Sequence, residues 1–398
     1  MRILHRFGRA ARKSVGRCCG CTVAVAFALC TPHAVFGAGQ IVAVGSTYGE
    51  TQPDAAEEDR PLILIGSEDG WQRVDAGGVV AGSLMGLSAD PSGRIWAFGA
   101  SASSPLLLSS HDGTSWTDTS APLARVAPDQ VPVAIAFQTD LVGWIATRGL
   151  LAGGGPQLFR TEDAGRTWVP VEHTGSKHVF GTYALRIPQG DRDVVELVVS
   201  NPDSVSVRTV SKDGVRVETI ASAHEMRAWA FVSVADTWWM FGRKDGCAAR
   251  NESCVEEVGG AVQVDFPAIR RVDAKRAALD RLIDAPTWTD IRAGHFFDTQ
   301  IGIAGGQSVG SNRRRAVLLR TTDGGASWER GVLPDTVAAG GGIAAVVLTN
   351  AQEGWAAFNY GSRPGTVLLR TTDGGQHWTE TSGGFALGRL RALLASGD

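Results

Sequence analysis

Residues 321–328 read TTDGGASW, residues 371–378 read TTDGGQHW and residues 161–168 read TEDAGRTW. Each copy has a hydroxyl residue, an acid two positions later, a glycine two positions after the acid, and a final tryptophan. Looser copies are SHDGTSW at 110–116, SEDGW at 67–71 and SKDG at 211–214. Self-similarity at intervals of tens of residues identifies repeat architectures. We call this phrase the box; its repetition favours a β-propeller.

A second phrase precedes each box and is rich in β-branched and aromatic residues. Its seven copies begin at Ile41, Ile95, Gly143, Val195, Thr237, Ile301 and Gly354, and most end in glycine or another small residue. The copies lie roughly 40 to 65 residues apart, the length of a four-stranded blade. The sequence therefore predicts an all-β fold, a seven-bladed β-propeller of four-stranded antiparallel blades.

The order of strands within a blade follows from residues 82–121. SLMGLSA predicts the inner strand, RIWAFGA the second, PLLLSS the third and SWTDTSA the outer strand, so the box forms the turn before the outer strand. The fifth blade lacks a box. We expect it to span 226–265, with Gly259 and Gly260 forming a bare turn in place of the box.

Both chain ends are expected to contribute to one blade. The phrase IVAVG at Ile41 has no inner strand before it, whereas LRALLASGD from Leu390 resembles SLMGLSADPSG from Ser83. The sequence therefore predicts that a C-terminal inner strand joins the N-terminal blade and closes the ring. Closure would remove the exposed sheet edges that an open array presents.

The first 37 residues have the pattern of a signal peptide. Six basic residues without an acid precede the apolar run CTVAVAFALC at 21–30, which is too short to span a bilayer, and small residues follow. We expect cleavage after Gly37 or one residue later, export to the periplasm or the medium, and a single propeller over 38–398. No stable membrane span is expected after cleavage.

Charge and cysteine content bound the function of residues 38–398. Acidic side chains outnumber basic ones there by about nine, which does not favour nucleic-acid binding. Cys247 and Cys254 are its two cysteines. In an exported chain a close pair predicts a disulfide, two free thiols being the alternative. A metal site is less favoured because no nearby histidine or second cysteine pair completes a ligand set.

The box has a structural logic. Its acid can accept hydrogen bonds from backbone N–H groups of a tight turn, its glycine permits a left-handed conformation, and its tryptophan can cover the turn. We expect a structural role, rather than catalysis or metal binding, for Asp69, Asp112, Asp163, Asp213, Asp323, Asp373, Trp116, Trp168, Trp328 and Trp378.

These phrases resemble the Asp-box or BNR repeat, S/T-x-D-x-G-x-T/S-W, of sialidases and other propeller families. The pairing of GW-type strands with LLRTTDGG boxes is most similar to the Ycf48-type exported seven-bladed propellers. The resemblance covers nearly all of 38–398. It departs at 110–116, which is one residue short, at His377, which replaces serine or threonine, and in the fourth and fifth blades. It implies a protein-binding assembly platform.

The sialidase resemblance implies an alternative, an exo-glycoside hydrolase. Such an enzyme needs an arginine cluster for the substrate carboxylate and a tyrosine made nucleophilic by a glutamate. An Arg-Ile-Pro phrase occurs at 186–188 with Tyr183 on the same strand, but it lies in the fourth blade rather than near the start of the domain. We therefore assign no catalytic residue, and neither a cofactor nor a phosphate-binding loop is expected.

Two segments are candidates for contact with a protein or glycan partner on the face opposite the boxes. Arg313, Arg314 and Arg315 form a positive loop on an acidic chain, suited to carboxylate or phosphate groups; a solvated loop is the alternative. Residues 272–285 read VDAKRAALDRLIDA, a composition typical of a helix, packed on the ring or available for docking.

Overall fold

The computed structural model describes residues 39–47, 59–101, 104–149, 157–171, 182–188, 193–200, 204–222, 226–234, 237–245, 265–273, 278–283, 289–308, 315–337, 340–361, 365–381 and 388–396. The chain divides into two units, Met1–Cys30 and Thr31–Asp398. All described residues belong to the second unit. The signal-peptide prediction for residues 1–37 lies outside them.

Within the described residues the strands form seven four-stranded antiparallel sheets, which we number along the chain. Each has an inner, second, third and outer strand. Sheet 1 contains β28 (Gly388–Ala395), β1 (Ile41–Thr47), β2 (Arg60–Ser67) and β3 (Gly70–Val74). Sheet 2 contains β4 (Ser83–Ala89), β5 (Ile95–Ser101), β6 (Ser104–Ser110) and β7 (Thr117–Asp118), and sheet 3 contains β8 (Gln130–Phe137), β9 (Gly143–Gly149), β10 (Gln157–Thr161) and β11 (Val169–Val171).

The remaining sheets follow in chain order. Sheet 4 contains β12 (Thr182–Arg186), β13 (Val194–Ser200), β14 (Ser204–Ser211) and β15 (Gly214–Ser222), and sheet 5 contains β16 (Met226–Val234), β17 (Thr237–Asp245), β18 (Asp265–Asp273) and β19 (Ala278–Ile283). Sheet 6 contains β20 (Thr289–Phe296), β21 (Gly302–Ser308), β22 (Arg315–Thr321) and β23 (Glu329–Arg330), and sheet 7 contains β24 (Gly341–Leu348), β25 (Gly354–Tyr360), β26 (Thr366–Thr371) and β27 (Thr379–Glu380).

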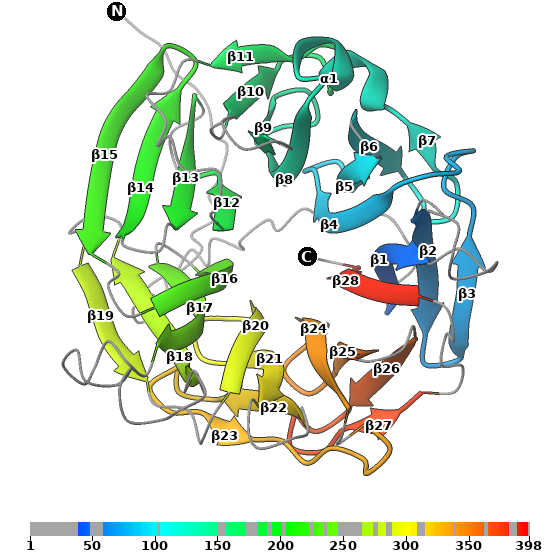
Figure 1. Ribbon diagram of the computed structural model, residues 1–398, viewed down its shortest axis with the longest axis vertical. Coiled ribbons are helices and arrows are strands. Elements are labelled where there is room, and N and C mark those ends of the chain that lie inside the picture. Colours follow the sequence, from blue (N-terminus) through cyan, green and yellow to red (C-terminus); the bar gives the residue numbers. More distant parts are fainter. Residues whose placement is uncertain are drawn as a thin grey trace, which may run out of the picture. The chain divides into compact units, whose positions relative to one another are not determined.

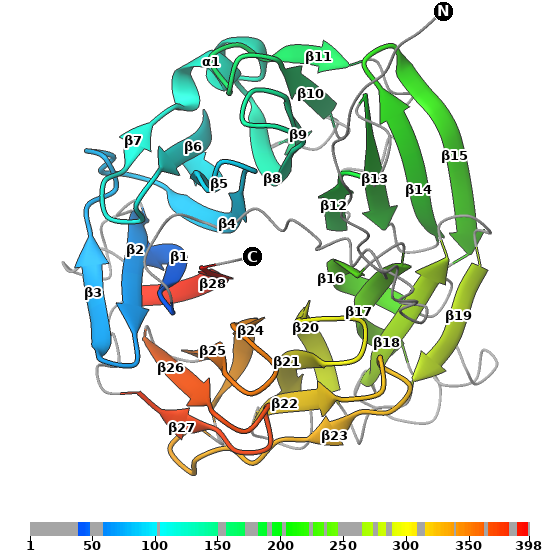
Figure 2. The same cartoon turned by 180° about the vertical axis from the view of Figure 1, so that it is seen from behind.

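Neighbouring sheets pack through their inner strands. β4 contacts β8, β8 contacts β12, and the series continues through β16, β20 and β24 to β28, which also contacts β4. In Figures 1 and 2 the sheets accordingly follow one another in colour order, with the red β28 beside the blue β1. This nearly all-β arrangement of four-stranded antiparallel sheets is consistent with the predicted β-propeller.

The apolar faces of adjacent sheets form the core between them. Val42, Ile63 and Leu84 from sheets 1 and 2 are buried in one cluster, and Ile303, Ile343 and Phe358 from sheets 6 and 7 are buried in another. A strand that is covered on both faces is buried along its whole length, as β1 is, and the first four residues of β1 are apolar. The second phrase of the sequence is therefore the second strand of every sheet.

The C-terminal strand pairs with the N-terminal one, as the sequence predicts. β28 pairs antiparallel with β1, with Ile41 opposite Ala395 and Thr47 opposite Gly388. Ser396 N donates to the carbonyl of Gln40 at 3.0 Å, which extends the pairing past the strand ends. Both ends of the described chain thus contribute to sheet 1.

The structure corrects the prediction of a helix over 272–285. β18 and β19 occupy this region and pair as a hairpin, with Val272 opposite Leu279 and Ile269 opposite Ile283. The alanine-rich composition favours a helix locally, but sheet 5 needs a third and an outer strand, and tertiary pairing outweighs propensity. The third and outer strands of sheet 5 are β18 and β19, so this sheet extends to Ile283, beyond the expected span 226–265. Gly259 and Gly260, the expected bare turn, lie outside the described residues.

Sheet 2 ends differently from the expectation for its outer strand. The predicted strand SWTDTSA is reduced to the two residues of β7, and the helix α1 (Ser120–Val126) follows at once. Leu107 N donates to Ser120 Oγ at 2.8 Å, so this hydroxyl holds the start of the helix against β6. Pro122 is tolerated there because the first turn of a helix has no backbone partner for its N–H groups.

Candidate binding site

The box forms the turn between the third and outer strands, as predicted, and its acid bonds to that turn. In sheet 6, Asp323 Oδ1 accepts from Ser327 N at 2.9 Å, and Asp323 Oδ2 accepts from the Ser327 hydroxyl at 2.5 Å. Thr321 donates its hydroxyl to Asp323 Oδ1 at 2.8 Å. Asp112, Asp163 and Asp373 make the corresponding contacts in their own turns. We call these four the complete boxes.

The hydrogen bonds of the complete boxes favour the charged acid. The hydroxyl and backbone N–H of Ser327 lower the pKa of Asp323, and the backbone N–H of Ser115 lowers the pKa of Asp112. Desolvation opposes the shift at Asp373, but the backbone N–H and imidazole of His377 outweigh it and bring the pKa of Asp373 to about 2. These carboxylates are therefore held ionised by the turns that they organise.

Two boxes are shortened, and their acids do not bond to the turn through their carboxylates. β2 and β3 are joined directly around Asp69, and β14 and β15 around Asp213. In each turn the acid's backbone N–H donates to the preceding serine hydroxyl, at 3.2 Å from Asp69 and 3.3 Å from Asp213. Within the described part of the chain neither carboxylate accepts a hydrogen bond.

The four predicted box tryptophans, Trp116, Trp168, Trp328 and Trp378, are buried. Trp116 Nε1 donates to the carbonyl of Gly113 at 2.8 Å, and Trp378 Nε1 donates to that of Gly375 at 3.2 Å. Trp168 packs on Phe137, which in turn stacks on Trp96 of sheet 2. The indole thus covers its turn and fills the space between neighbouring sheets.

The remaining predicted residues have different positions. Cys247, Cys254, Arg313 and Arg314 lie outside the described residues, so the disulfide and most of the positive loop stay predictions. Arg315 is exposed at the start of β22. It therefore marks the end of sheet 6 opposite the box, where the loop was expected.

Arg186 of the Arg-Ile-Pro phrase is engaged inside the protein. It forms an ion pair with Glu196, donates to Ser233 Oγ at 3.2 Å and lies over the Trp238 ring at 5.2 Å. Burial raises the pKa of the nearby Tyr183, which disfavours the phenolate needed for nucleophilic attack. The contacts of Arg186 with Ser233 and Trp238 join sheet 4 to sheet 5.

A pocket of about 350 Å³ lies at the end of the sheets opposite the boxes. Its lining comes from the first halves of the inner strands β20, β24 and β28, from Met85 of the inner strand β4, and from the last residues of the second strands β21 and β25. Figure 2 labels these four inner strands. Arg292, Arg389 and Arg391 line it, together with the amides Gln307 and Asn359, and its lining contains no acidic residue. We call it the arginine pocket.

Two residues that line the arginine pocket, Arg292 and Asn359, are held in place by contacts with neighbouring residues. Arg292 donates from Nε to Asp290 Oδ2 at 2.9 Å, and its Nη2 lies 2.8 Å from the same oxygen of this buried acid. Its guanidinium also lies 5.7 Å from the centre of the Trp229 ring. Asn359 joins sheet 7 to sheet 1, because its side chain donates to the Leu390 carbonyl at 2.7 Å and accepts from Leu390 N at 3.1 Å.

Six inner strands contain a register shift in which one residue has no partner on the second strand. We call these the bulged residues: Met85, Val133, Trp229, Arg292, Ala344 and Arg391. A bulge redirects the side chain of its unpaired residue. Met85, Arg292, Ala344 and Arg391 line the arginine pocket. A fifth bulged residue, Trp229, does not line it but contacts Arg292, which does.

Sequence reasoning missed these residues although two signals were present. Each bulged residue precedes a glycine or alanine, in LMG at 84–86, PVA at 132–134, AWA at 228–230, IRA at 291–293, IAA at 343–345 and LRA at 390–392. The second phrase ends in Gly45, Gly99 or Gly306 in three sheets. A Cβ there would lie 1.9 Å from an inner-strand carbonyl oxygen, so only glycine fits beside the bulge.

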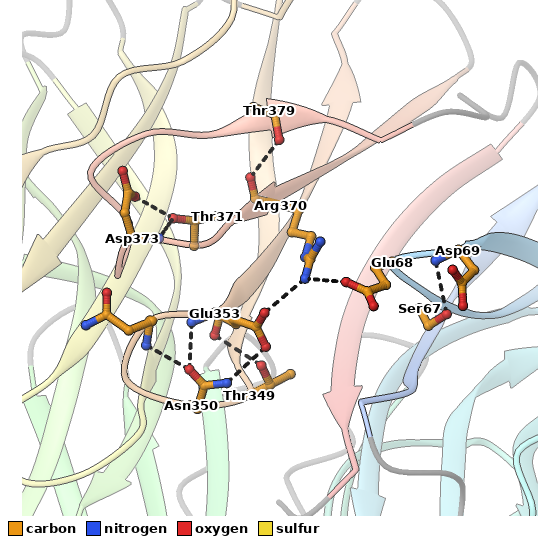
Figure 3. A network of polar contacts seen from close by, with 11 residues as sticks. Ser67, Glu68, Asp69, Thr349, Asn350, Glu353, Arg370, Thr371, Asp373 and Thr379 are labelled. Carbon is orange, nitrogen blue, oxygen red and sulfur yellow. Dashed lines mark hydrogen bonds and ion pairs between the residues drawn. The ribbon is translucent and has the colours of Figure 1, made fainter.

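A second pocket of about 390 Å³ lies at the box end, between sheets 1 and 7. Figure 3 shows its polar network: Arg370 of β26 contacts Glu68 at 3.0 Å and Glu353 at 2.9 Å, and so links the two sheets. Arg370 also lies over the Trp355 ring at 5.8 Å. Asp69 lines this pocket as well, which makes it acidic in contrast to the arginine pocket.

In the described part of the chain, no group of three or more histidine, cysteine or acidic side chains could hold a metal ion. No helix among these residues has the length and apolarity required to cross a bilayer.

No protein-family model and no curated protein matches the chain. Among solved structures it is similar to a candidate 6-phosphogluconolactonase from Bacteroides fragilis NCTC 9343, with a TM-score of 0.54 and 8% identity over 89% of this chain and 98% of that chain. A second candidate 6-phosphogluconolactonase, from Bacteroides uniformis ATCC 8492, gives a TM-score of 0.52 and 9% identity over 89% and 99%.

The Synechocystis apocarotenoid oxygenase gives a TM-score of 0.51 and 8% identity over 91% of this chain and 93% of that chain. At these identities the likeness concerns the fold alone.

Proposed function

We propose that this chain is an exported, non-catalytic propeller of seven blades that binds anionic groups of a protein or glycan partner at the arginine pocket. The arginine pocket carries the proposal: three guanidinium groups line one cavity without an acidic residue, on a chain whose acids outnumber its basic residues. Guanidinium groups match carboxylate, sulfate and phosphate oxygens in charge and shape.

The seven-bladed, closed arrangement rests on contacts of the C-terminal strand. β28 pairs with β1 and contacts β4 on one side and β24 on the other, so the series of inner strands returns to its start. Deleting the last ten residues removes β28 and exposes the edge of β1. We expect the melting temperature to fall by more than 10 °C; an unchanged transition would contradict closure.

Export rests on the basic, apolar and small-residue pattern of residues 1–37. Expression in a bacterial host followed by N-terminal sequencing of the periplasmic product tests it. We expect a new terminus at Ala38 or Gly39. Recovery of the intact chain from the cytoplasm alone would contradict export.

We propose that the protein is not an enzyme because the side chains that could serve as catalytic groups are engaged in structural contacts. The complete-box acids accept hydrogen bonds from their own turns, and Arg186 is occupied by Glu196. For the same reason the sialidase-like alternative has no free arginine and no activated tyrosine at 183–188. We expect no hydrolysis of a fluorogenic sialoside; turnover that disappears in Arg186→Ala would favour the enzyme.

Binding is tested with two carriers of carboxylates, an oligogalacturonate hexamer and a hexa-aspartate peptide, against neutral maltohexaose. We expect the wild-type protein to bind at least one acidic carrier in calorimetry, and the affinity to fall as salt rises, because the charges are partly exposed. Arg389→Gln should weaken binding about tenfold. Arg125→Gln, an equal charge change at the end of α1, is the control. Equal affinity for maltohexaose would contradict the proposal.

A further inference from the structure

Four of the bulged residues are more exposed than the residue that precedes each of them. Their neighbours Leu84, Ile291, Ile343 and Leu390 are buried, whereas Met85, Arg292, Ala344 and Arg391 are partly or fully exposed. Because a bulged residue makes no ladder contact with the second strand, its side chain can change without altering the strand pairing. The fold thus repeats one variable, solvent-facing position around the inner strands.

We propose that this bulged position selects the ligand of the arginine pocket, with Arg292 and Arg391 together holding one anionic group. The inference rests on the proposed function and deepens it, because it names which positions decide the charge of the group bound. Arg292 comes from sheet 6 and Arg391 from sheet 1, and Ala344 of sheet 7 lies at the same position between them in chain order.

The two arginines differ in how firmly they are held. Arg292 is anchored by Asp290, whose side chain is 1% exposed, and by Trp229, while 44% of the Arg292 side chain stays exposed. Nε and Nη2 face Asp290, which leaves the Nη1 edge of the guanidinium for a ligand. Arg391 is exposed and makes no ion pair within the described residues. One anchored and one adjustable guanidinium can close on an oxyanion from two sides.

Ala344 provides the sharpest test, because alanine is uncharged and a substitution there can introduce a charge of either sign. If the bulged position sets ligand charge, Ala344→Arg adds a fourth guanidinium to the same cavity and Ala344→Glu places a carboxylate there. Neither change alters the hydrogen bonds of β24, since residue 344 is skipped in the pairing with β25. The two variants should therefore move affinity in opposite directions.

The experiment titrates the oligogalacturonate hexamer, and separately the hexa-aspartate peptide, into wild type and variants at one salt concentration. We expect Arg292→Gln and Arg391→Gln each to weaken binding about tenfold. Ala344→Arg should strengthen it about threefold or more, and Ala344→Glu should weaken it about tenfold. Arg125→Gln, on the helix α1, should stay within twofold of wild type.

The outcomes separate this inference from the proposed function. If wild type binds neither acidic probe, the proposed function fails and the inference with it. If wild type binds but the arginine and Ala344 variants all stay within twofold, the anionic group is held elsewhere and the inference alone is wrong. Circular dichroism checks folding; should Arg292→Gln not fold, the opposed Ala344 variants still decide the question.

Discussion

The two ends of the sheets use charge in opposite ways. At the box end, acids of the complete boxes accept hydrogen bonds from their own turns, as Asp323 does from Ser327. At the other end, arginines reach the arginine pocket from bulges and inner strands, with no acid in its lining. The repeated phrase thus supports the scaffold, whereas the proposed recognition uses a position that varies from sheet to sheet.

The largest effect is expected where a bulge requires a glycine. A Cβ on Gly306 would lie 1.9 Å from the carbonyl oxygen of Asp290, directly behind Arg292, and backbone cannot give way as a side chain can. We expect Gly306→Ala to lower the free energy of unfolding by about 3 kcal/mol or more. Urea denaturation measures it. Gly78→Ala, in open space, should cost only about 1 kcal/mol; equal losses would contradict the bulge account.

The next prediction separates complete from shortened boxes at the box end. Asp323→Ala removes the acceptor of the Ser327 N–H and hydroxyl, whereas Asp69→Ala removes a carboxylate that accepts no hydrogen bond within the described residues. We expect Asp323→Ala to lower the free energy of unfolding by about 1 to 2 kcal/mol and Asp69→Ala by less than about 0.5 kcal/mol. Similar losses for both would show that the carboxylate contacts are unimportant.

Ala164 offers a gain of stability in a complete box. It has a φ of 60°, in the left-handed region, where the sheet 6 and sheet 7 boxes have Gly324 and Gly374. Alanine is strained there and glycine is not, although glycine loses more entropy on folding. We expect Ala164→Gly to raise the free energy of unfolding by about 0.5 kcal/mol, and Gly374→Ala to lower it. A loss of stability in Ala164→Gly would contradict the strain.

The smallest effect concerns pH at the box end. Because the folded-state pKa of Asp373 is depressed to about 2, its contribution to stability is full above the ordinary carboxyl pKa near 4. It is lost as pH falls through about 2. We therefore expect the urea midpoint of wild type to fall between pH 4 and 2, and Asp373→Asn to show a shallower fall. Parallel curves would contradict the assignment.

Much of the scaffold could be predicted from the residues. The box glycines and tryptophans predict the turns in which they lie, and the second phrase, rich in β-branched residues, predicts a buried strand. Residues 272–285 misled because their composition favours a helix, while the need of sheet 5 for two more strands is visible only in the assembled fold. The looser copies SEDGW and SKDG were visible in the sequence, but it was not predicted that their acids make no carboxylate hydrogen bond to the turn, since these copies have too few residues to wrap around the acid.

The sequence predicts a binding surface at the end of the sheets opposite the boxes, which is where the arginine pocket lies, but the residues of this pocket could not be named. Arg292 and Arg391 are far apart in sequence and come together because β28 packs between β24 and β4. The positive run at 313–315 gave a stronger local signal, because adjacent charges are visible in a sequence and convergent ones are not. The glycine or alanine that follows each bulged residue is a sequence signal from which such bulges could be predicted.

The central claim, that the arginine pocket rather than the box end takes the ligand, is most directly tested by nuclear magnetic resonance with a spin-labelled oligogalacturonate hexamer. We expect it to broaden the backbone amide signals of Ala344 and Arg391 at concentrations that leave those of Gly325 and Gly375 in the box turns unchanged. Broadening of the box-turn signals with sharp signals at Ala344 and Arg391 would contradict the account.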